Sequence, residues 1–155
     1  MKSRIKIISA GLALVMLASV AIAEGVSLKG VKCIMAPKDA KEANAAEWKE
    51  GKVYFCCGGC KGKFEKMTKE DKEKMAAKSN AQLVSTKQYE QKACPLSGGD
   101  VNKEASLEVN GATVLFCCNN CKGKVEKLEG DEQLDAVFGE KAFKTAKFEK
   151  VASKE

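Results

Sequence analysis

The residues with the clearest chemical potential in this chain are its eight cysteines, which form two sets of identical spacing. In each set twenty-two residues separate a lone cysteine from an adjacent pair, and two more residues separate this pair from a fourth cysteine. The members are Cys33, Cys56, Cys57 and Cys60 in the first set, and Cys94, Cys117, Cys118 and Cys121, each 61 residues later, in the second. Thiolates are soft ligands, so each set suits a thiophilic ion, for which zinc and copper(I) are the candidates.

Each group of three cysteines lies between an apolar strand pattern and a helical pattern. The middle positions are held by Gly58-Gly59 in the first set and Asn119-Asn120 in the second, residue types that tolerate tight turns. A helix N-terminus and nearby lysines favour ionised thiols, which are the form that binds metal. The pattern therefore predicts metal ligands at helix starts.

Two hairpins and a series of helices should carry these turns. We expect one hairpin to turn at Glu50-Gly51 and the other at Asn110-Gly111, a pair that favours a type I′ turn. Since Gly111 lies one residue further from its cysteines than Gly51 does, the second hairpin is predicted to contain an extra residue or a bulge. A single long helix is expected over 61–78, with a break at Ser79-Asn80.

The fold predicted from these elements is α+β, with two small tandem modules. The expected boundaries are a first module over 24–80, a packed connector over 81–92, and a second module with C-terminal helices over 93–155. Each module has about sixty residues, a size at which a hydrophobic core alone is marginal and metals or disulfides are often needed.

The two copies resemble YHS and TRASH domains, which are small cysteine-based metal-binding modules. The matching residues cover about 31–78 and 92–129, and they include Tyr54-Phe55-Cys56 with Cys60-Lys61, and Phe116-Cys117 with Cys121-Lys122. The resemblance implies a treble-clef-like fold and heavy-metal binding or sensing, sometimes in proteins that handle copper. The chain departs from the family at Cys57 and Cys118, where serine is frequent, and at 34–36, where proline and glycine are usual.

Two ligand sets are open for each module. The spacing of the family selects Cys33, Cys56 and Cys60, which would leave an open position on zinc or complete a trigonal copper(I) site. Addition of Cys57 would close a tetrahedral zinc site, although the chain must bend between Cys56 and Cys57 for both to reach one ion. We expect Cys57 and Cys118 to be ligands, giving four thiolates per site and two ions per chain.

Two other uses of the cysteines compete with metal binding. Small secreted domains often use cysteines as disulfides, so the modules could instead be a disulfide-stapled surface for protein interaction. A bridge between adjacent cysteines such as Cys56 and Cys57 is strained, which argues against this reading. A thiol–disulfide redox protein is the third possibility, but a Cys-x-x-Cys motif within a βαβ pattern is not visible. Without histidine, and with no nucleophile–base arrangement, the chain is not expected to be an enzyme.

The N-terminus predicts export. Residues 1–23 combine a basic start, a short apolar run and Ala21-Ile22-Ala23, which is typical of a cleaved signal peptide. Its removal takes away Lys2, Arg4 and Lys6, so the formal net charge falls from +6 to +3. The expected location is periplasmic or secreted, with no membrane attachment after cleavage. Few aromatic residues and no remaining arginine make nucleic acid an unsuitable partner. The expected partner is a metal ion, and a periplasmic or membrane protein that handles metals fits as a second.

Overall fold

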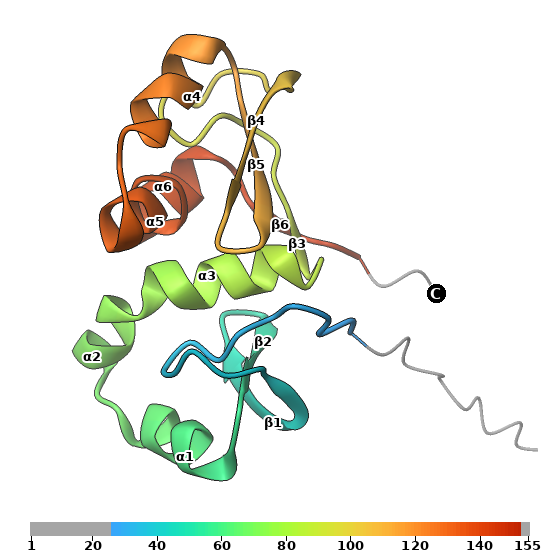
Figure 1. The fold of residues 1–155 in the computed structure, drawn as a ribbon, viewed down its shortest axis with the longest axis vertical. Helices are drawn as coiled ribbons and strands as arrows, with labels where there is room; N and C mark the ends of the chain where they lie inside the picture. The colour runs from blue at the N-terminus through green and yellow to red at the C-terminus, as the bar shows by residue number, and fades with distance from the viewer. Residues whose placement is uncertain (1–25, 153–155) are drawn as a thin grey trace, which may run out of the picture.

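Each module begins with a β-hairpin that ends at the cysteine turn. In the computed structural model, which describes residues 26–152, β1 (Lys41–Trp48) pairs antiparallel with β2 (Gly51–Phe55), and β4 (Asn102–Val109) with β5 (Ala112–Phe116). The predicted signal peptide over 1–23 lies outside the described residues. The prediction of an α+β chain with two small modules is confirmed (Figure 1).

The two hairpins have the same turn length, so the extra residue predicted for the second one is wrong, whereas the irregularity predicted as its alternative occurs in both hairpins. Trp48 pairs with Gly51 and Val109 with Ala112, which leaves two residues in each turn. Lys49 adopts a φ of 52°, close to the 51° of Asn110. Gly51 is therefore a strand residue, and both hairpins have a shift of register at equivalent positions nearer their start.

Three helices follow the first hairpin, where the sequence predicted one. They are α1 (Gly58–Lys66), α2 (Lys69–Lys74) and α3 (Ala76–Ser85). The hydroxyl of Thr68 accepts a hydrogen bond from the Asp71 amide at 3.2 Å and so begins a new helix after a break at Met67. The predicted break at Ser79-Asn80 is wrong, since both residues are buried inside α3.

The second module repeats this order. Its helices are α4 (Asn119–Glu126), α5 (Gly130–Phe138) and α6 (Glu140–Thr145). After the last helix of each module comes a two-residue strand, β3 (Tyr89–Glu90) in the first and β6 (Glu149–Lys150) in the second. These two strands pair antiparallel with each other. The repeat seen in the cysteines therefore extends to the ends of both modules.

Helix α3 lies between the modules and contacts both of them (Figure 1). Its Asn80 side chain accepts a hydrogen bond from Trp48 Nε1 at 2.8 Å and donates one to the Phe138 carbonyl, also at 2.8 Å. On the surface, Lys49 forms a 2.9 Å ion pair with Glu140. The predicted module boundary after residue 80 falls within α3, a helix that both modules share.

Two hydrophobic clusters form the interior, and they differ in size. The smaller one belongs to the first module and consists of Cys33, Ile34, Ala46, Val53, Phe55 and Phe64. The larger one is built mainly by the second module, with Phe116, Phe138 and Val114 at its centre, and includes Leu83 from α3. Trp48 packs against both clusters. Trp48 therefore joins the interiors of the two modules.

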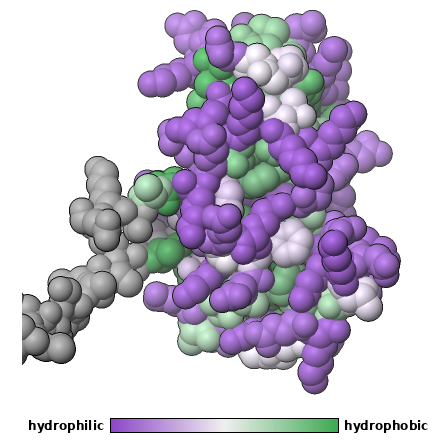
Figure 2. All heavy atoms as spheres, turned by 180° about the vertical axis from the view of Figure 1, so that it is seen from behind, coloured by the Kyte–Doolittle hydropathy of each residue, from purple (hydrophilic) through white to green (hydrophobic). Residues whose placement is uncertain are grey.

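The surface is dominated by charged side chains. On the face shown in Figure 2, hydrophilic residues spread over both modules, with smaller areas of hydrophobic residues between them. Within residues 26–152, no helix has the length and apolar character needed to cross a membrane.

Candidate metal centres

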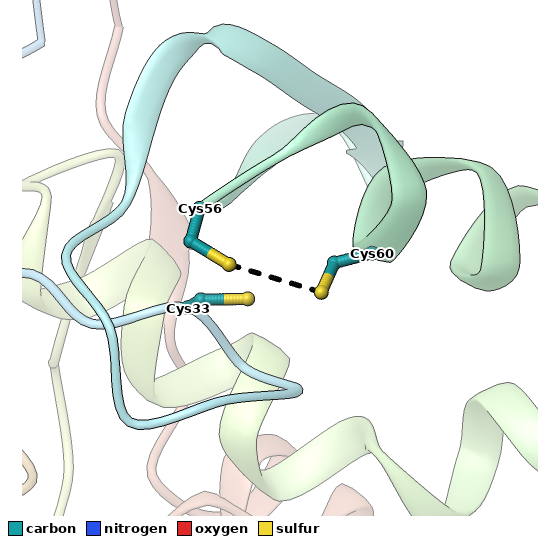
Figure 3. A group of neighbouring side chains, drawn as sticks. All are labelled: Cys33, Cys56 and Cys60. Carbon is teal, nitrogen blue, oxygen red and sulfur yellow. Dashed lines mark hydrogen bonds between the residues drawn. The ribbon is translucent and has the colours of Figure 1, made fainter.

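The first candidate centre brings together three sulfur atoms from three different elements. Cys33 lies in the loop before β1, Cys56 directly follows β2, and Cys60 is in the first turn of α1. Their Sγ atoms all lie within 4.8 Å of one another and converge on one point (Figure 3). The Cys56 and Cys60 sulfurs are 3.8 Å apart.

The second centre has the same construction. Cys94, Cys117 and Cys121 also place their Sγ atoms within 4.8 Å of one another, and the Cys117 and Cys121 sulfurs are 3.6 Å apart. We call these groups the first thiol triad (Cys33, Cys56, Cys60) and the second thiol triad (Cys94, Cys117, Cys121).

The sulfur separations fit a metal ion. Zinc–sulfur bonds of about 2.3 Å in tetrahedral geometry place the sulfur atoms about 3.8 Å apart. The measured separations of 3.8 Å and 3.6 Å are close to this value. They are well beyond the roughly 2.05 Å of a disulfide bond, and all eight cysteines, each in the described part of the chain, are free. Each triad can therefore hold a thiophilic ion.

Cys57 and Cys118 lie beside the triads and outside them. Both side chains are exposed. Cys57 immediately precedes α1, and Cys118 immediately precedes α4. The Cys57 sulfur is 3.9 Å from that of Cys56, and the Cys118 sulfur is 3.7 Å from that of Cys117. The structure thus brings three predicted ligands together in each module, and the fourth ligand stays a prediction that requires its side chain to turn inwards.

The pKa values of the cysteines in and beside the triads shift in opposite directions. The Cys60 thiol interacts with the sulfurs of Cys57 and Cys56, which raises the pKa of Cys60 to about 12. Burial and the contact with Cys117 raise the pKa of Cys121 to about 12 as well. In contrast, the nearby Cys60 amide and thiol lower the pKa of Cys57 to about 7, although the Cys57 side chain forms no capping hydrogen bond. A metal ion must displace the protons of Cys60 and Cys121 in order to bind.

The lone cysteine of each triad is held in a short loop that closes on itself. The Cys33 amide donates to the Lys38 carbonyl at 2.8 Å, and the Cys94 amide donates to the Gly99 carbonyl at the same distance. At the start of each loop, Lys32 and Ala93 form isolated bridges with aspartates seven residues later. The two loops therefore present their cysteines in the same way.

Two glutamines join these loops to the strands that carry the cysteine pairs. Gln82 Nε2 donates to the carbonyls of Lys32 and Tyr54, and its Oε1 accepts from the Tyr54 amide at 2.6 Å. In the second module, Gln91 forms the equivalent three bonds with the residues 61 positions later, Ala93 and Leu115. Sequence reasoning missed both glutamines, because they occupy different positions in the two copies and leave no repeat to detect.

A serine near the second triad was also missed. The Ser97 hydroxyl lies 3.2 Å from the Cys117 sulfur. Together with the backbone amides of Cys117 and Leu96, it outweighs the effect of burial and lowers the pKa of Cys94 to about 7. The equivalent position in the first module is Ala36, which has no hydrogen-bonding side chain. Alignment of the two copies at the 61-residue offset would have revealed this difference.

The chain matches no protein-family model, no curated protein and no solved structure. What the protein does must therefore be inferred from the two thiol triads and their surroundings.

Proposed function

We propose that this protein binds thiophilic metal ions, zinc or copper(I), with one ion in each module. The observation that carries this proposal is the convergence of two separate triads, each with its three sulfurs within 4.8 Å. Two independent copies of one loop, one strand end and one helix start produce the same arrangement. Stapling of the modules by disulfides would instead require sulfur atoms at bonding distance.

We further propose that the modules belong with the YHS and TRASH domains and act outside the cytoplasm as a carrier, buffer or sensor of metal. The motifs around Cys56 and Cys117 and the basic-apolar N-terminus support this reading. The chain is proposed to be a binding protein rather than an enzyme, because its cysteines have no histidine with which to form a nucleophile–base pair.

Metal titration tests the proposal directly. Under reducing conditions the protein should take up zinc or copper(I) with saturation near two equivalents. A variant with Cys94, Cys117 and Cys121 replaced by serine should bind one equivalent and keep the first triad loaded. Saturation at one equivalent in the parent protein would indicate a single shared site, and no uptake would refute the proposal.

A further inference from the structure

The two triads share their cysteine geometry and differ in what surrounds them. Cys94 is fully buried in the larger hydrophobic cluster, against which Cys117 and Cys121 also pack. Cys33 keeps 6% of its surface exposed and belongs to the smaller cluster of the first module. The second triad is therefore attached to the most extensively packed part of the protein.

Ser97 gives the second triad a polar contact that the first triad lacks. Its hydroxyl lies 3.2 Å from the Cys117 sulfur, and it also hydrogen-bonds the amide of Gly99 in the Cys94 loop. A hydroxyl that donates to a thiolate stabilises the charged sulfur and fixes its orientation. Residues that contact metal ligands in this way commonly contribute 10–100-fold to metal affinity. Ala36 cannot make this contact in the first module.

A cleft opens beside the first triad. Its volume is about 710 Å³, and its walls are the segment 29–37, which includes Cys33, part of α3, and the tip of the hairpin formed by β4 and β5. No cysteine of the second triad lines this cleft. An incoming ligand can therefore approach the first site from the side of Cys33, which lines this cleft.

From these three differences we infer that the first site exchanges its ion, whereas the second site retains its ion as part of the fold. This inference rests on the proposed function and assigns a different role to each site. The second triad, in which Cys94 is fully buried and Cys117 contacts Ser97, is the better placed of the two to hold a structural ion. The first triad, beside the cleft and without a serine, is the site that delivers or takes up cargo.

The unmodified chain can test the inference. After the protein is loaded with two equivalents of zinc, excess chromophoric chelator should withdraw one equivalent quickly and the other at least tenfold more slowly. Alkylation of newly freed thiols at intervals, followed by peptide mass spectrometry, shows which triad has been emptied. We expect Cys33, Cys56 and Cys60 to be modified first. Cys57 and Cys118 are left out of the comparison, because they are exposed in both modules.

A matched pair of variants tests the part played by serine. Ser97→Ala should speed zinc loss from the second triad 10–100-fold, and Ala36→Ser should slow loss from the first. Circular dichroism checks that each variant is folded. Because Ala36→Ser introduces a hydroxyl beside the first triad, it tests the effect of serine even if Ser97→Ala is unstable. Equal rates at the two triads, or earlier emptying of the second, would overturn the inference while the proposed function stands. Failure to load either zinc or copper(I) would refute the proposed function itself.

Discussion

The cysteines of the two modules lie on equivalent backbone structures, but the side chains that stabilise these structures come from different elements. In the first module, the glutamine that joins the cysteine loop to the strand end is Gln82, which projects from α3. In the second, it is Gln91, which directly follows β3. Both glutamines come from the segment between the two cysteine sets, so this segment supports both sites.

The comparison shows which parts of the repeat the site requires. The three thiols, the closed loop and the hairpin register are equivalent in both copies. The supporting glutamine, the residue at position 36 or 97 and the size of the hydrophobic cluster differ. The geometry of the metal site therefore depends on the thiols, the loop and the hairpin register. Differences between the sites in how firmly they retain an ion should follow from the features that are not shared.

The largest effect is expected from loss of a cysteine that belongs to a triad. Cys60→Ser should abolish zinc binding at the first site, because both possible ligand sets contain Cys60, and Cys121→Ser should do the same at the second.

Cys57→Ser should weaken zinc retention at least tenfold, about 1.4 kcal/mol or more, if Cys57 turns inwards as the fourth ligand. Competition with a chelator measures each affinity. Retention equal to that of the parent in Cys57→Ser would establish the three-thiolate site.

Gln82→Leu should affect the first module most. The change leaves the Tyr54 amide and the carbonyls of Tyr54 and Lys32 without the partner seen in the structure, two of these bonds being buried. Since each buried group left unpaired costs about 1–3 kcal/mol, the two buried groups should lower the free energy of unfolding by about 2–6 kcal/mol. Urea denaturation measures this loss.

Gln82→Leu should also lose zinc from the first triad and keep it at the second, whereas Gln91→Leu should do the reverse. Gln133→Leu is the control, because the Gln133 side chain forms one hydrogen bond, to the Val125 carbonyl, and bonds neither cysteine loop. Equal zinc loss from both triads in either variant would contradict the assignment of one glutamine to each site.

Zinc affinity should rise with pH at both sites. With pKa values of about 12, Cys60 and Cys121 are protonated at neutral pH in the metal-free protein, so an ion must displace their protons. Each displaced proton makes the apparent affinity fall about tenfold per unit decrease in pH. Titration in weak buffer between about pH 6 and pH 8 should detect proton release as zinc is added. An affinity independent of pH would contradict displacement of these protons.

Gly51 offers a smaller test of the comparison between hairpins. A Cβ atom at this position would lie 2.7 Å from Leu83 Cδ2 and 2.9 Å from Gln88 Oε1, whereas the equivalent Ala112 is accommodated in the second hairpin. Gly51→Ala should therefore destabilise the protein by about 1 kcal/mol, because these side chains must shift. Thermal unfolding measures the change, and a gain in stability would show that the close approach of α3 is not limiting.

Local patterns in the sequence were sufficient to predict the modules and the cysteine turns. The repeated cysteines, the Asn110-Gly111 turn and the apolar residues before Cys56 and Cys117 each act through nearby residues. Gly51 was misread as a turn residue because glycine suits a turn and a close approach equally well. The role of α3 could not be predicted, because Asn80 reads as a helix break until its buried partners, Trp48 and Phe138, are known.

In the candidate sites, too, features with a local sequence signal were predicted and features that depend on distant residues were not. All six cysteines of the triads were identified from their spacing, whereas Gln82 and Gln91 were missed. Gln82 bonds a carbonyl 50 residues away, and Gln91 bonds one 24 residues away, so neither pairing has a local signal. The difference at Ser97 could have been found by aligning the two copies, since only the second one carries a hydroxyl at that position.

The central claim is that each triad binds one metal ion, and native mass spectrometry of protein purified under mild conditions tests it most directly. The expected result is a mass that corresponds to the chain with two zinc or two copper(I) ions, falling to one ion when Cys94, Cys117 and Cys121 are replaced by serine. A metal-free mass reduced by two hydrogens for each bridged cysteine pair would contradict the claim and show that the cysteines form disulfides.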